Sequence, residues 1–122
     1  MIDDLYEMIG GRRTIWAATE SFYRRVLADK QLSHFFEGAD MEHLHARQSM
    51  FISMLSGGRV VYTGKDINAA HAQARIKGLN DTHFDIFLKH FRDALAEARV
   101  KQDKLEKVMQ LLESKRSAVL HR

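Results

Sequence analysis

Residues 10–29 read GGRRTIWAATESFYRRVLAD and indicate most clearly which fold the chain adopts. Apolar and weakly polar side chains recur in this stretch at every third or fourth position, which is the period of an amphipathic helix. The Gly10-Gly11 pair is typical of a break between helices. We therefore expect a helix over about Arg12–Asp29, preceded by a short helix over about Asp3–Ile9. The residues on the inward face of the longer helix are Ile15, Thr19, Phe22, Tyr23, Val26 and Leu27.

The same period continues along the rest of the chain, between glycines that mark the helix ends because the sequence contains no proline. A further helix is expected to begin after Asn80-Asp81, either of which can cap it. Only Val60–Thr63 resembles a strand, and it is too short to pair in an otherwise helical chain. The pattern predicts an all-α fold. The remaining helices are expected over about Asp40–Leu55, Asp66–Arg75 and Asp103–Leu120.

The composition is typical of a small globular protein. A length of 122 residues suits one domain over residues 1–122, and 45% hydrophobic with 29% charged residues argues against a disordered chain. The absence of cysteine excludes disulfides, a thiolate nucleophile, zinc fingers and Cys-ligated iron–sulfur clusters. No apolar stretch has the length of a membrane span or the character of a signal peptide. We expect a cytoplasmic protein that does not act at a membrane.

The formal net charge of +3 raises the question of nucleic-acid binding. On the last expected helix, however, Lys104 and Lys107 alternate with Asp103 and Glu106. Such a mixture is typical of a solvated helical face with pairs of opposite charge three and four residues apart. A nucleic-acid interface would be basic without interruption. We therefore expect no nucleic-acid partner.

Three polar side chains stand where the helical pattern favours apolar ones. Tyr23 lies in the apolar stripe of its helix, Gln48 follows Leu44 by one turn, and His71 stands among alanines. Each has an ordinary structural explanation, as a buried phenol with a backbone partner, a satisfied amide and a hydrogen-bonded core histidine. Together they place an imidazole, a phenol and an amide on three different helices.

This set of side chains suits haem chemistry. Neutral imidazole is the usual axial ligand of haem iron, and hydroxyl and amide donors can hydrogen-bond a diatomic ligand that carries partial negative charge. Seven phenylalanines can wall a flat apolar macrocycle. The other histidines form no evident metal site. His43 and His45 point to nearly opposite sides of a helix, and His83 and His90 stand about 10 Å apart along theirs.

Short motifs spread along the chain match one protein family. In their order and spacing they resemble the group I truncated haemoglobins over nearly the whole chain. The resemblance implies a 2-on-2 sandwich of α-helices around a haem. The matching pieces are Gly10-Gly11, Phe22–Asp29, Phe35–Gly38, Asp40-Met41, Gln48, Gly57-Gly58, Tyr62–Gly64, His71 and His83–Asp85.

The resemblance also implies roles for single residues. His71 matches the proximal ligand of the haem iron, and Tyr23 and Gln48 match the distal pair that holds a bound gas ligand. Leu44 matches the apolar residue at the distal gate, and Phe36 the phenylalanine that packs on the haem plane. The remaining implied contacts are Arg47 at a haem propionate, Phe51 and Ile52 at an apolar ligand tunnel, and Ile67 and Phe84 on the proximal side. A solvent-facing arginine and ordinary core packing explain Arg47, Phe51 and Ile52 equally well.

Two departures from the family pattern bear on the cofactor. Arg47 stands where some relatives carry a histidine that closes the sixth iron position, so no ligand is expected from it. Ser114 precedes Lys115-Arg116, where some relatives carry a histidine that attaches haem covalently. We therefore expect haem b that is bound non-covalently.

The predicted function is haem-dependent oxygen binding, with nitric oxide and carbon monoxide as further gas ligands. One alternative is a nitric oxide dioxygenase, which needs a cellular reductase because the chain carries no flavin or nicotinamide fingerprint. Peroxidase-like chemistry and ligand sensing at the same site are further alternatives. The last alternative is a haem-free helical interaction domain in which His71, Tyr23 and Gln48 are core residues.

Overall fold

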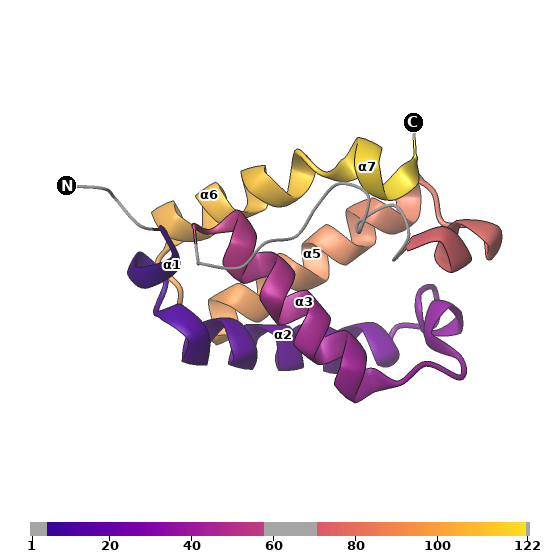
Figure 1. The fold of residues 1–122 in the computed structure, drawn as a ribbon, viewed down its shortest axis with the longest axis horizontal. Coiled ribbons are helices and arrows are strands. Elements are labelled where there is room, and N and C mark those ends of the chain that lie inside the picture. Colours follow the sequence, from indigo (N-terminus) through magenta and orange to yellow (C-terminus); the bar gives the residue numbers. More distant parts are fainter. Residues whose placement is uncertain (1–4, 58–70, 122) are drawn as a thin grey trace.

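The computed structural model describes residues 5–57 and 71–121, and every regular element in these two ranges is helical (Figure 1). The all-α prediction is confirmed. Of the helix expected over Asp66–Arg75, the structure describes residue 71 onward, which is helical to residue 76. The strand-like segment Val60–Thr63 lies outside the described residues. The other elements are α1 (Leu5–Met8), α2 (Gly11–Leu27), the 3-10 helix η1 (Ser33–Phe36), α3 (Met41–Leu55), α5 (Asp81–Glu97), α6 (Gln102–Glu113) and α7 (Arg116–Leu120).

Side-chain caps set the starts of α3 and α5. Asn80 caps α5, because its side-chain oxygen accepts hydrogen bonds from the N–H groups of Thr82 and His83 at 2.9 and 3.3 Å. The His83 ring completes a capping box, in which its Nδ1 accepts from the N–H of Asn80 at 3.2 Å. Asp40 caps α3 by accepting from the N–H of His43 at 3.2 Å. Of the two possible caps for α5, the structure therefore uses Asn80.

Gly10 separates α1 from α2. Its φ of 114° lies in the left-handed region, which residues with a Cβ adopt at a cost. A Cβ on Gly10 would also collide with the side chain of Thr14. A larger residue at this position would therefore displace α1 from the start of α2.

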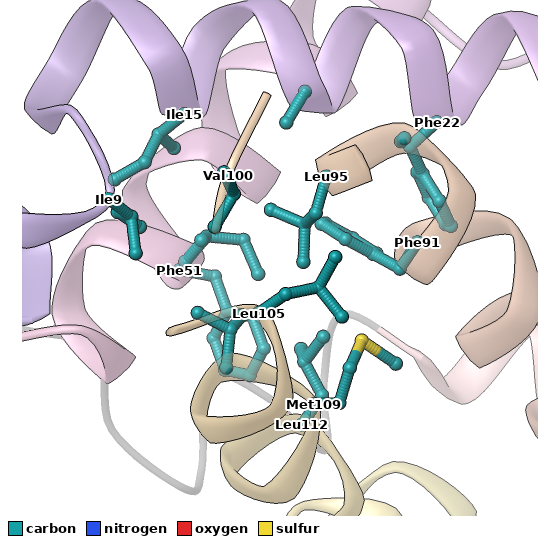
Figure 2. Close-up of a cluster of buried hydrophobic side chains, with 14 of the residues drawn as sticks. Ile9, Ile15, Phe22, Phe51, Phe91, Leu95, Val100, Leu105, Met109 and Leu112 are labelled. Carbon is teal, nitrogen blue, oxygen red and sulfur yellow. The ribbon is translucent and has the colours of Figure 1, made fainter. Parts of the chain in front are cut away.

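Helix α2 lies at the centre of the packing. It contacts both α3 and α5, and α5 in turn packs against α6. The pair of α2 and α3 therefore lies on the pair of α5 and α6 (Figure 1). The rings of Phe22 on α2 and Phe91 on α5 have centroids 4.3 Å apart. Figure 2 shows the core between these helices. Its labelled members are Ile9, Ile15, Phe22, Phe51, Phe91, Leu95, Val100, Leu105, Met109 and Leu112.

The prediction of a single helix over Asp103–Leu120 is wrong, because the structure divides this stretch into α6 and α7. Arg116, the first residue of α7, turns toward α5, where its Nη1 lies 2.9 Å from Asp81 Oδ1. The apolar pattern conceals this break. Buried Leu112 and Val119 stand seven residues apart, as they would on one face of a continuous helix.

The end of α2 also differs from the expected helix over Arg12–Asp29. The helix ends at Leu27, and the carboxylate of Asp29 accepts a hydrogen bond from the N–H of Gln31 at 2.9 Å. A short polar side chain that bonds to the nearby backbone competes with helix formation. The 3-10 helix η1 follows this turn, and with four residues it is too short to show a hydrophobic period.

Glu97, the last residue of α5, ties this helix to α2. The buried hydroxyl of Ser21 donates to its carboxylate, and guanidinium nitrogens of Arg24 and Arg25 lie 3.3 and 3.2 Å from it. The hydrogen bond from Ser21, followed by those from the two arginines, lowers the pKa of Glu97 from 4.5 to about 2. The carboxylate is exposed, so solvent screening keeps its contribution to stability small.

We predict that Glu97→Gln lowers the thermal unfolding midpoint by a few degrees at pH 7, because it removes the charge that this cluster surrounds. Since the folded-state pKa is depressed, the stabilisation is present above about pH 4.5 and is lost as the pH falls toward about 2. Unfolding followed by circular dichroism should show the two proteins converging over this range. Glu20→Gln is the matched control, since Glu20 lies 3.5 Å from Arg24 in an exposed pair. An equal shift in this control would contradict the prediction.

Candidate functional site

Tyr23 lies at the junction of α2, η1 and α3. Its half-buried ring meets the rings of Phe22 and Phe36 edge to face, with centroids 5.1 and 5.8 Å apart. Its hydroxyl donates a hydrogen bond to the carbonyl oxygen of Leu44 at 3.5 Å. Bonds of this type are usually about 2.7–2.8 Å long, so this one is weak. The phenol therefore brings a hydroxyl group into an aromatic environment beside α3.

A group of aromatic rings continues from Tyr23 across η1 to α5. The rings of Phe36 and Phe87 lie 6.1 Å apart, and that of Phe35 lies 6.1 Å from Phe87 and 5.0 Å from His83. The three phenylalanines pack against the core and yet are only partly buried. Partly exposed aromatic rings from several elements provide an apolar surface that suits a flat hydrophobic ligand.

Leu44 and Gln48 lie one turn apart on α3, and both are half-buried. Beside them, His45 contacts α2. The His45 ring stacks on Trp16 with centroids 3.8 Å apart, and its Nε2 lies 3.0 Å from the Trp16 carbonyl oxygen. Leu44 and Gln48 lie on one face of α3, next to the face that carries His45. The hydrogen bond from Tyr23 shows that Leu44 lies beside the phenol.

His71 is half-buried on the helical stretch over residues 71–76, which contacts two other elements. Arg75 Nη1 donates to the carbonyl oxygen of Val119 on α7 at 2.9 Å. Lys77 Nζ lies 3.4 Å from the carbonyl oxygen of His34 on η1. The helix of His71 therefore lies at the same end of the molecule as η1 (Figure 1), and Phe36 of η1 contacts the ring of Tyr23.

The other residues predicted for the site lie on several elements. Phe51 is buried in the core (Figure 2), and Arg47 is half-buried on α3. Phe84 is buried on α5, with the guanidinium carbon of Arg116 at 4.6 Å from its ring centre. Ile67 lies outside the described residues. Tyr23 therefore contacts η1 and α3 directly. Phe84 lies on α5, which is connected with Tyr23 through the rings of Phe87 and Phe36.

Three further histidines have structural partners. His90 Nε2 lies 2.7 Å from Asp29 Oδ2, His83 caps α5, and His45 stacks on Trp16. Within residues 5–57 and 71–121, no three histidine, aspartate or glutamate side chains are grouped so as to hold a metal ion. Haem iron needs no such group, because the porphyrin supplies most of its ligands.

Arg75 and Arg116 border the site and are not evident from the sequence pattern. Their bonds to Val119, Asp81 and Asp85 join residues 31 to 44 positions apart. Only the pair of Arg116 with Glu113, three positions earlier, has a helical spacing that the sequence could have revealed.

The residues present fit a haem. The half-exposed rings of Tyr23, Phe36 and Phe87 provide the apolar surface that a porphyrin requires. His71 provides a half-buried imidazole, and imidazole is the usual proximal ligand of globin haem iron. The Tyr23 hydroxyl adds a hydrogen-bond donor.

Comparisons with known proteins agree with this fit. The family model of the bacterial-like globins matches residues 4–121. A group 1 truncated haemoglobin from Tetrahymena pyriformis is 35% identical over 118 residues, which cover 95% of this chain and 93% of the relative. Another, from Synechocystis sp., is 35% identical over 105 residues and covers 85% of each chain. The chain belongs to the group 1 truncated haemoglobins.

Solved structures of truncated haemoglobins share the fold. The 2/2 haemoglobin of Synechococcus sp. PCC 7002, in the cyanomet state and with covalently attached haem, has a TM-score of 0.90. It is 33% identical in sequence, and the match covers 98% of this chain and all of that one. The Fe(III) form of the Tetrahymena pyriformis protein has a TM-score of 0.86 at 33% identity, over 97% of this chain and 98% of that one. The predicted 2-on-2 architecture is confirmed.

As a truncated haemoglobin, the protein binds haem, and globins bind diatomic gases such as oxygen. Within the described ranges, no helix combines the length and the hydropathy needed to cross a bilayer.

We predict that haem added to the haem-free truncated haemoglobin produces a Soret band and raises the thermal midpoint by at least about 10 °C. A ligand that binds only the folded state raises the free energy of unfolding, and the increase is larger for a ligand of higher affinity. Iron-free protoporphyrin is the control, because it covers the same apolar side chains without an axial bond and should stabilise less. Absence of a Soret band after reconstitution would show that the pocket does not accept haem.

Proposed function

We propose that this truncated haemoglobin binds oxygen at a haem b that it holds non-covalently, with His71 as the proximal ligand and Tyr23 and Gln48 as the distal donors. Bound haem would supply an iron that takes up oxygen, nitric oxide or carbon monoxide. The observation that carries the proposal is the Tyr23 hydroxyl, which stands among the rings of Phe22 and Phe36 and donates to the carbonyl oxygen of Leu44 on α3 at 3.5 Å.

The environment of Tyr23 supports its role as a donor. The bond from the hydroxyl to the carbonyl oxygen of Leu44 is 3.5 Å long, and a bond of this length costs little to exchange for a bond to a ligand. The rings of Phe22 and Phe36 fix the phenol from two sides, so the hydroxyl is oriented before a ligand arrives. Such a donor stabilises the charge that a bound diatomic ligand develops.

Gln48 provides the second donor in this proposal. Its amide is half-buried one turn after Leu44, whose carbonyl accepts from Tyr23. The stack of His45 on Trp16 joins this part of α3 to α2, the helix that carries Tyr23. An amide and a phenol from two helices can then donate to the same ligand.

Further residues are proposed to contact the haem around this distal pair and on its proximal side. Phe36, which touches the Tyr23 ring, is proposed to pack on the haem plane, and Leu44 to border the distal entry. Phe84 supports the proximal side from within α5. Arg47 at a propionate, Phe51 at a ligand tunnel and Ile67 beside the haem stay predictions from the sequence.

Non-covalent attachment is proposed from Ser114. This residue lies in the turn between α6 and α7, where its hydroxyl donates to the carbonyl oxygen of Leu111 at 2.5 Å. A hydroxyl engaged in this way, in place of an imidazole, offers no nitrogen for a bond to the haem.

Nitric oxide dioxygenation would use the same donors and would need a reductase to return the iron to the ferrous state. Such a partner would be met in the cytoplasm, which is the location expected from the sequence. Peroxidase-like chemistry and ligand sensing also stay predictions from the sequence.

We predict that Tyr23→Phe increases the oxygen dissociation rate at least about tenfold. Hydrogen bonds to charged acceptors contribute about 1.5–3 kcal/mol, and about 1.4 kcal/mol corresponds to a factor of ten. Stopped-flow displacement of oxygen by carbon monoxide measures the rate. Tyr6→Phe makes the same chemical change on α1 and should leave the rate unchanged. An unaltered rate in Tyr23→Phe would remove this residue from the distal site.

We also predict that acidified organic solvent extracts all of the haem from the purified protein. With Ser114 in the turn after α6, no covalent bond should retain it. Absorbance of the two phases and the intact mass of the protein measure the outcome. A mass increased by that of one haem would disprove non-covalent attachment.

A further inference from the structure

Arginines hold both ends of the short helix α7. Arg116 is its first residue, and Arg75 Nη1 donates to the carbonyl oxygen of Val119 near its end, at 2.9 Å. In Figure 1, α7 lies above the start of α5, close to the helix that begins at His71. The short helix therefore connects α5 with the turn that carries His71, although these elements are distant from α7 in the sequence.

The Arg116 end of α7 is attached to the first turns of α5. The side chain of Arg116 is only 17% exposed, and it reaches Asp81 at 2.9 Å and also Asp85. Its Nε lies 2.7 Å from Glu113 at the end of α6. The guanidinium group also lies over the ring of Phe84, at 4.6 Å from its centre. Several charged bonds in one partly buried cluster hold this end more firmly than a single exposed pair would.

The Arg75 end of α7 meets a carbonyl group that needs a donor. The last carbonyl oxygens of a helix have no partner within it, and Val119 is buried. Arg75 supplies the missing donor as a charge-assisted hydrogen bond. Arg75 follows His71 by four residues, one helical turn, so the two side chains share a face of the same stretch.

We propose that Arg75 is a positioning residue for His71. Helix α7, fixed on α5 by Arg116, holds Arg75 through the Val119 carbonyl, and this bond holds the helical turn from which the His71 imidazole reaches the haem. The inference rests on the proposed role of His71 as the iron ligand. Without the bond, the turn gains freedom to shift and rotate, so the imidazole no longer meets the iron in one geometry.

A second contact of the same stretch provides the comparison. Lys77 lies 3.4 Å from the carbonyl oxygen of His34 on η1, which is a longer and more exposed bond than that of Arg75. Lys77→Met removes a positive charge from the stretch and leaves the contact with α7 intact. It is therefore the matched control for Arg75→Met.

The test compares the haem-loaded proteins by two measurements that do not depend on activity. Arg75→Met should release haem to an excess of acceptor apoglobin at least about fivefold faster than the parent protein, since it loses a charge-assisted bond. The iron–histidine stretching band in the resonance Raman spectrum of the ferrous protein should broaden and shift. Arg75→Lys, which keeps a donor, should restore most of both properties, and Lys77→Met should resemble the parent protein.

Haem-free protein provides a second readout in case Arg75→Met retains too little haem. Amide hydrogen exchange over residues 71–79 should be faster in Arg75→Met than in the parent, with unchanged helix content by circular dichroism. Unchanged haem release together with an unchanged stretching band would overturn the proposal. Equal effects of Lys77→Met and Arg75→Met would overturn it as well.

One further variant separates this inference from the proposed function. His71→Ala should abolish the iron–histidine band, and added imidazole should restore it. If the band persists in His71→Ala, the proposed ligand is wrong. If His71→Ala behaves as expected and Arg75→Met matches the parent protein, only the role of Arg75 is wrong.

Discussion

The ring contact between Phe22 of α2 and Phe91 of α5 determines much of the rest of the structure. Both rings are buried, their centroids lie 4.3 Å apart, and they join two helices whose inward faces are both part of the core. Tyr23 follows Phe22 directly, so it points about 100° away around the helix. Burial of one aromatic residue therefore directs the next one toward η1 and α3. The hydrophobic effect in this way orients a polar group in the pocket.

The proposed distal side of the haem site depends on contacts that join α3 and η1 to this frame. The His45 ring on Trp16 joins α3 to α2. At the other end of α2, Asp29 accepts hydrogen bonds from the N–H of Gln31 and from His90, and the bond with His90 lowers the pKa of the Asp29 carboxyl. This turn leads the chain into η1. Phe36 then meets Tyr23, because the turn at Asp29 holds the start of the segment that carries η1 and the Asp40 cap of α3 holds its end.

The proposed proximal side of the haem site depends on charged groups. Arg116 joins α5, α6 and α7, and Arg75 joins α7 to the helical stretch of His71. The Glu97 cluster, at the opposite end of α5 from Asp81, ties α5 to α2. Ion pairs that support the site and ion pairs that support the fold therefore lie at different ends of the same helix.

The sequence by itself determined the all-α class, most helix positions and the family, because hydrophobic period, glycine breaks and short motifs are all local features. It also identified Tyr23, Gln48 and His71 as polar side chains at inward positions. It did not reveal η1 or the division between α6 and α7, since a four-residue helix shows no period and the buried spacing of Leu112 and Val119 suits a continuous helix. The partners of Arg75 and Arg116 were decided only by the tertiary structure. Hydrogen bonds between residues 31 to 44 positions apart depend on how the helices pack, and no local pattern records that.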